Sequence, residues 1–185
     1  MGGDETSLMA ISKQDIKYTH TPVVYQGLLS CKIPVIAAMQ GHAIGGGLAF
    51  GCYADLILLA EESIYSANFM KYGFTPGMGA TYILPKKLGE VLGQEMLFTA
   101  KNYHGGELKQ RGAQINVVKK SAVITAAIKL AKELAEKPLI SLKLLKQQRV
   151  RTIKEELPAI IEQELAMHAI TFKLPEVRER IKQLF

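Results

Sequence analysis

One short stretch of this 185-residue chain constrains its fold more than any other. Residues 35–39, Val-Ile-Ala-Ala-Met, form an apolar run without charge, which is typical of a strand that is buried on both faces. Three consecutive glycines, residues 45–47, follow it, and residues 48–53 have the composition of a helix. This order predicts a strand, a sharp turn and a helix N-terminus. The outward N–H groups of such a terminus can hold an oxygen that is gaining negative charge.

By itself, the glycine turn also has a plainer interpretation, in which it only lets a helix pack closely onto a sheet. The spacing excludes two common phosphate-binding motifs, since neither Gly-x-Gly-x-x-Gly nor Gly-Lys followed by Ser or Thr occurs there. The role of the turn therefore depends on the residues around it.

Length and composition predict one globular unit with a sizeable core, because 48% of the residues are hydrophobic and 22% are charged. No apolar run approaches the roughly 20 residues of a membrane span, and the first residues lack the basic and apolar regions of a signal peptide. We therefore expect a cytoplasmic protein with no membrane partner. Cys31 and Cys52 lack the spacing of a metal site, and we expect neither a metal nor a cofactor.

The net charge of +6 is spread along the chain, with a concentration in the last third. Such a balance suits nucleic acid, an acidic carrier protein or the phosphates of a coenzyme. For most of these lysines a solvated helix face is the plainer interpretation. Because no aromatic platform is interleaved with them, we expect no nucleic-acid partner.

The chain as a whole predicts alternating strands and helices followed by helices alone. Strands are expected at 33–39, 56–60, 63–67 and 115–118; helices at 22–30, 48–53, 80–84, 90–100, 104–111, 121–137, 139–152, 158–173 and 176–185; and a glycine-rich loop at 68–79. Prolines at 138, 158 and 175 are expected at helix starts or breaks. The order predicts an α/β core in residues 1–120 and a helical, oligomer-forming extension in residues 121–185.

Several motifs in register resemble the crotonase, or enoyl-CoA hydratase/isomerase, superfamily. They are Gly2-Gly3-Asp4, residues 33–47, Asp55, residues 76–81, Leu88-Gly89 and Arg111-Gly112. The resemblance implies a crotonase-like ββα spiral core, with the N-terminal strands of the family fold absent from this chain. It also implies a homo-trimer or hexamer, and an oxyanion hole for a thioester carbonyl made by the backbone N–H groups of Gly3 and Gly46.

The chain departs from the family at the two glutamates with which hydratases add or remove water. Those positions are occupied here by Ala49 and Phe69, and neither side chain can accept or deliver a proton. Hydration by that carboxylate pair is therefore not available. Two alternatives remain: an enoyl-CoA hydratase or isomerase with a displaced acid–base residue, and a non-catalytic or RNA-binding relative.

Residues 68–81, 163–172 and 180–185 resemble more closely the decarboxylases of polyketide β-branching. This resemblance implies decarboxylation of 3-methylglutaconyl-acyl carrier protein to 3-methylcrotonyl-acyl carrier protein, with a coenzyme A thioester as the alternative substrate. It places the catalytic histidine at His168 and the catalytic lysine at Lys17, with Lys13 as the alternative.

Each of these candidates also has a plainer interpretation. On a helix, His168 shares one face with apolar residues seven and three positions before it and four positions after it, where a lone histidine is more often a core residue. Lys17 in a polar loop is by default solvated. Lys71 and Tyr72, in the glycine-rich loop, are candidates for lining the substrate pocket together with Ala49 and Phe69, although a structural role is the default.

Overall fold

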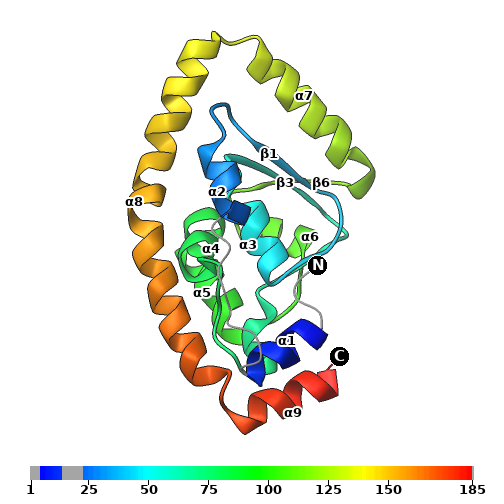
Figure 1. Cartoon of the computed structure of the whole chain (residues 1–185). Coiled ribbons are helices and arrows are strands. Elements are labelled where there is room, and N and C mark those ends of the chain that lie inside the picture. Colours follow the sequence, from blue (N-terminus) through cyan, green and yellow to red (C-terminus); the bar gives the residue numbers. More distant parts are fainter. Residues whose placement is uncertain (1–4, 14–22, 185) are drawn as a thin grey trace.

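The computed structural model of the chain describes residues 5–13 and 23–184 (Figure 1). In this part of the chain the strands form two small sheets. The first sheet has the order β1-β3-β6 and is parallel, with strands at Ile36–Met39, Leu56–Ala60 and Asn116–Val118. The second has the order β2-β4-β5, with strands at Ala43–Ile44, Ile64–Ser66 and Tyr103–His104; β2 is parallel to β4, and β5 is antiparallel to it.

Helices surround these sheets. They are α1 (Glu5–Ser12), α2 (Val23–Ser30), α3 (Gly46–Cys52), the 3-10 helix η1 (Asn68–Tyr72), α4 (Ala80–Leu88), α5 (Glu90–Thr99), α6 (Gly105–Gln110), the 3-10 helix η2 (Lys120–Ala122), α7 (Val123–Ala135), α8 (Leu139–Thr171) and α9 (Pro175–Leu184). Figure 1 shows α8 running along one whole side of the molecule, with α7 near its start and α9 at its end. No helix in the described ranges is both long and apolar enough to cross a membrane.

The central strand β3 is buried on both faces, as its unbroken apolar sequence predicts. Successive side chains of a strand point to opposite faces, so Leu58 and Ala60 pack with Val123 of α7. Ile57 and Leu59 belong to the larger cluster on the other face, which includes the buried residues of α3 and α4. The sheet thus separates α7 from the core that holds the glycine turn.

Strand β1 differs from the prediction, because it is shorter than residues 33–39 and is not fully buried. All four of its residues are only partly covered. The reason is its position, since β1 lies at the edge of the sheet and, among the described strands, pairs only with β3. The apolar run alone could not distinguish an edge strand from a central one.

The predicted break at Pro158 is also wrong, because residues 139–171 form one continuous helix with Pro158 inside it. A proline in a helix interior costs about 3 kcal/mol or more, through a lost hydrogen bond and a clash. Ile153, Leu157 and Ile161 are buried on either side of it. Burying each such side chain contributes about 1.5–3 kcal/mol, so together the three outweigh the cost of the proline.

The buried face of α8 contains three polar side chains among its apolar ones. Its buried residues are Lys146, Val150, Ile153, Leu157, Ile161, Glu164 and His168. Spacings of three and four residues place them all on one face. A buried polar side chain costs free energy unless it is paired, so the partners of these three decide how α8 docks.

Lys146 is the first of the three, and its partner is Asp55. Its ammonium group donates to Asp55 Oδ2 at 2.6 Å and to the carbonyl of Leu28 at 3.1 Å. The same carboxylate oxygen accepts the N–H of Val35 at 2.7 Å. Asp55 therefore joins α8 to the segments that lead into β1 and β3.

Replacing Asp55→Asn is expected to lower the free energy of unfolding by about 3 kcal/mol, because it leaves the ammonium of Lys146 buried without its counter-ion. Urea denaturation measures this loss. Arg151→Met is the control, since its partner Glu155 is 3.9 Å away on the exposed side of α8. That control is expected to change stability by less than about 0.5 kcal/mol. Equal, small losses in both variants would contradict the role given to Asp55.

Candidate active site

The structure confirms the predicted strand, glycine turn and helix. Gly45 has a φ of +56° and precedes α3, which begins at Gly46. A side chain at Gly45 would be strained at this φ, and its Cβ would come within 2.8 Å of Asn68 Oδ1. The N–H groups of Gly46 and Gly47 lie in the first turn of α3, where no acceptor exists within the helix. They are therefore placed to bind an acceptor from outside.

Two side chains from the glycine-rich segment cover this turn. A Cβ at Gly46 would lie only 2.6 Å from the sulfur of Met78, so the Met78 side chain packs directly on Gly46. The ring of Phe69 lies 3.8 Å from the corresponding position at Gly45. The turn is thus covered by an apolar surface, where a hydrogen bond to a developing charge is stronger than in water.

The backbone at Met78 is held in an uncommon conformation by two hydrogen bonds. Its φ is 62°, in the left-handed region that costs a residue other than glycine about 1–2 kcal/mol. The Met78 carbonyl accepts the hydroxyl of Tyr53 at 2.7 Å. The next residue, Gly79, donates its N–H to Glu164 Oε2 at 2.6 Å. These two bonds fix Met78 from both sides.

Glu164, the second polar residue on the buried face of α8, is fully buried. Besides the Gly79 N–H, it accepts the N–H of Thr81 at 3.0 Å and the Thr81 hydroxyl at 2.6 Å. Burial raises the pKa of the Glu164 carboxyl, and the hydrogen bonds from Thr81 and Gly79 oppose that shift. Because these donors are the N-cap Gly79 and Thr81 in the first turn of α4, the carboxylate also faces the positive end of that helix.

His168 lies one turn after Glu164 and is the third polar residue of that face. Its Nε2 is 2.8 Å from the carbonyl oxygen of Thr75. A carbonyl can only accept, so Nε2 carries a proton and donates it. The ring is only 3% exposed and meets Phe172 and Phe74 edge-on, with centroids 5.3 and 6.4 Å away.

An aromatic cluster connects His168 with the glycine turn. Phe74 lies at its centre: it stacks on Phe172 at 4.5 Å and on Tyr72 at 6.0 Å, and meets Phe69 edge-on at 6.2 Å. Phe69 in turn approaches Gly45. The structure therefore brings the candidates Gly46, Phe69, Tyr72 and His168 around one apolar region.

The other candidates lie in different environments. Ala49 is fully buried on α3 and Phe69 is buried, so apolar side chains fill both of the positions that the family resemblance assigns to glutamates. Burial raises the pKa of the Tyr72 hydroxyl, whereas the neighbouring Lys71 is exposed. Lys13 is exposed beside the end of α1. Gly3 and Lys17 lie outside the described residues.

Three residues of this region were missed from the sequence: Glu164, Phe74 and Met78. A glutamate in a charged helix is normally solvated, and only its place on the buried stripe with Ile161 and His168 could have marked it. Phe74 and Met78 sit in an irregular segment without periodicity. Across residues 5–13 and 23–184, no group of three or more His, Cys, Asp or Glu side chains could hold a metal ion.

Comparison with known proteins identifies the family. The family model described as "Enoyl-CoA hydratase/isomerase" matches residues 1–184. The chain belongs to this family. Over 184 residues it is 51% identical to the bacillaene synthase decarboxylase PksI of Bacillus subtilis (strain 168), a match that covers 100% of this chain and 74% of PksI.

Solved structures extend this likeness to the fold. A structure from a dehydratase/decarboxylase enzyme couple involved in polyketide β-branching matches with a TM-score of 0.95 and 51% identity, covering 100% of this chain and 72% of that one. The ECH2 decarboxylase domain of CurF from Lyngbya majuscula matches with a TM-score of 0.95 and 42% identity, covering 100% and 74%. These matches confirm the predicted crotonase-like α/β fold.

Glu164→Gln tests the carboxylate that holds the covering turn. A glutamine offers one acceptor oxygen where Glu164 uses two, so at least one donor of Gly79 or Thr81 loses its partner. We expect a loss of about 1–3 kcal/mol in the free energy of unfolding, measured by urea denaturation. The matched control is Glu162→Gln, on the exposed side of the same helix, which is expected to stay within about 0.5 kcal/mol of the unmodified protein. A Glu164→Gln variant as stable as this control would contradict the analysis.

Proposed function

We propose that this chain decarboxylates a 3-methylglutaconyl group on an acyl carrier protein to a 3-methylcrotonyl group, in polyketide β-branching. One observation carries the proposal: the glycine turn opens α3, while Ala49 and Phe69, the positions to which the family resemblance assigns the hydratase glutamates, are buried apolar residues. The 51% identity to PksI, which is named a decarboxylase, supports the same reaction. A hydratase would need a carboxylate at this site, and Glu164 is already engaged by Gly79 and Thr81.

The reaction needs an acceptor for the electron pair that decarboxylation leaves behind. When the bond to the distal carboxylate breaks and CO2 leaves, the pair moves into the conjugated thioester, whose oxygen becomes negative. In our proposal the N–H groups of Gly46 and Gly3 hold this oxygen as an oxyanion hole. Removing one such donor in other enzymes costs about 3 kcal/mol of barrier, so this contribution is large.

The dienolate then needs a proton on the carbon that lost CO2, and we assign its delivery to His168. The bond from Nε2 to Thr75 and the edge-on rings of Phe74 and Phe172 fix the orientation of the imidazole. Lys17, with Lys13 as the alternative, is assigned to the distal carboxylate before it leaves. Tyr72, Phe69 and Ala49 would line the acyl pocket, and Lys71 its rim.

The proposal includes a homo-oligomer, a trimer or a hexamer, working in the cytoplasm. Residues 121–185 would form the oligomerisation region beside a core in residues 1–120. Exposed apolar side chains on α7 and α8 support this division, because apolar patches on a surface commonly mark interfaces. They are Ile124, Ile128, Leu139, Ile140, Leu144 and Ile170.

Intact mass spectrometry of 3-methylglutaconyl-acyl carrier protein, incubated with this protein, tests the reaction itself. We expect the carrier to lose the mass of one CO2. A change by the mass of one water would instead indicate a hydratase, and an unchanged carrier would contradict both enzyme assignments. The same incubation with the coenzyme A thioester compares the two possible substrates.

His168→Gln tests the assigned proton donor. The amide of glutamine can still donate to Thr75, so we expect little change in melting temperature. It cannot deliver a proton, and proton transfer by a positioned side chain typically contributes about 10²–10⁴-fold, so decarboxylation is expected to fall at least about a hundredfold. His104→Gln, at an exposed histidine, is the matched control. A His168→Gln variant that melts early but keeps normal activity per folded molecule would overturn the assignment.

The charge of the chain gives a second kinetic test. Acyl carrier proteins are acidic, and a chain of net charge +6 is expected to steer them toward it. Raising the salt concentration should therefore lower kcat/KM for the carrier-bound substrate, because screening shortens the reach of charges to about 8 Å at physiological ionic strength. A small uncharged thioester mimic should be nearly unaffected. Equal salt dependence for both substrates would contradict electrostatic steering.

A further inference from the structure

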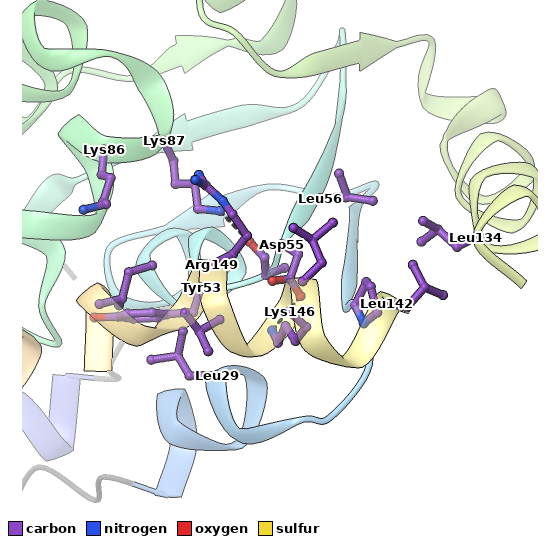
Figure 2. A pocket seen from close by; sticks show the side chains of 15 residues that line it. Leu29, Tyr53, Asp55, Leu56, Lys86, Lys87, Leu134, Leu142, Lys146 and Arg149 are labelled. Atoms are coloured by element: carbon purple, nitrogen blue, oxygen red, sulfur yellow. Dashed lines mark hydrogen bonds and ion pairs between the residues drawn. The ribbon is translucent and has the colours of Figure 1, made fainter. Parts of the chain in front are cut away.

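A cavity of about 410 Å³ lies at the far end of α3 from the glycine turn (Figure 2). Tyr53 and Ala54, which follow α3, line it together with Asp55. Leucines form much of its wall: Leu29, Leu56, Leu134, Leu142 and Leu145. Its size lies within the roughly 300–1,000 Å³ that is usual for sites of small molecules.

Four cationic side chains line the same cavity: Lys86, Lys87, Lys146 and Arg149. Among its lining residues the one acid is Asp55, and Lys146 already holds it at 2.6 Å. Lys86 is likewise engaged, since it donates to the hydroxyl of Tyr82 and lies 3.9 Å from the carboxylate of Glu156. Lys87 and Arg149 are therefore the two cations of this cavity that no carboxylate lining it is bonded to.

Lys87 and Arg149 approach each other from different helices. Figure 2 shows Arg149 extending from α8 toward the end of Lys87, which comes from the last turn of α4. The ammonium of Lys87 donates to the carbonyl of Ala54 at 2.7 Å, which is a neutral acceptor. Burial lowers the pKa of Lys87; the nearby Cys52 and Asp55 raise it in part, and the positive charges of Lys146 and Arg149 lower it. An anion placed between the two would relieve this repulsion.

We propose that this cavity is a binding site for an amphipathic carboxylate, whose head group is held by Lys87 and Arg149 and whose alkyl tail lies against the leucines. A guanidinium can bind a carboxylate through two parallel hydrogen bonds, and the ammonium adds a third. The apolar wall favours an alkyl chain over a second polar group. This site goes beyond the proposed decarboxylation, because α3 separates it from the turn at Gly46.

Isothermal titration calorimetry of the whole protein with acetate, butanoate, hexanoate and octanoate tests the site. The affinity is expected to rise about fourfold for each methylene that becomes buried. Inorganic phosphate, which has a head group and no tail, and octanamide, which has a tail and no charge, are both expected to bind at least about tenfold more weakly than octanoate. No acyl carrier substrate is needed, so the result does not depend on the decarboxylase assignment.

Variants decide whether the titrated site is this cavity. Arg149→Met and Lys87→Met are each expected to weaken octanoate binding at least about tenfold, because each removes one head-group contact. Lys86→Met is the matched control and should bind octanoate normally, since its charge is already met by Glu156. Arg149 is exposed, so its variant tests the site even where Lys87→Met fails to fold. Octanoate binding that is absent, or that is unchanged in Arg149→Met, would overturn the proposal, as would phosphate or octanamide binding as tight as that of octanoate.

Discussion

The docking of α8 depends on three buried polar side chains that each need a particular partner. Lys146 meets Asp55, Glu164 meets Gly79 and Thr81, and His168 meets Thr75. Apolar contacts alone would tolerate a shift of the helix by one turn, since the stripe of Val, Ile and Leu repeats along it. The polar partners do not repeat. Because each buried polar group left unpaired costs about 1–3 kcal/mol, and more where it is charged, such a shift is strongly disfavoured.

The position of α8 along its axis, which these partners fix, has a direct consequence for the candidate active site. Glu164 and His168 are four residues apart on the same face, so the bonds that fix Glu164 also fix where the imidazole lies. The same carboxylate holds Gly79, and thereby the Met78 side chain that covers Gly46. The proposed proton donor and the cover of the proposed oxyanion site are therefore parts of one rigid unit, although 90 residues separate Met78 from His168 in the sequence. Precise placement of this kind is what catalytic groups require.

The sequence predicted well those features that depend on a few neighbouring residues. The glycine turn, α3 and the exact bounds of β3 follow from local signals of apolar runs and glycines. The missed features depend on distant partners. The helix through Pro158 persists because residues around it are buried against other elements, and β1 is partly exposed because of its place in the sheet. Likewise, nothing near Glu164 in the chain shows that its acceptors will meet donors more than 80 residues away.

The short helix α3 explains why its two ends suit different chemistry. A helix carries partial positive charge at its N-terminus and partial negative charge at its C-terminus. At the N-terminal end, the N–H groups of Gly46 and Gly47 suit an oxygen that becomes negative. Just past the C-terminal end, the carbonyl of Ala54 accepts the ammonium of Lys87. Lys87 thus has a structural reason to be there, whereas among the described residues no acceptor is bonded to Arg149. For this reason Arg149, rather than Lys87, is the residue whose position points most directly to a ligand in the cavity that the two residues line.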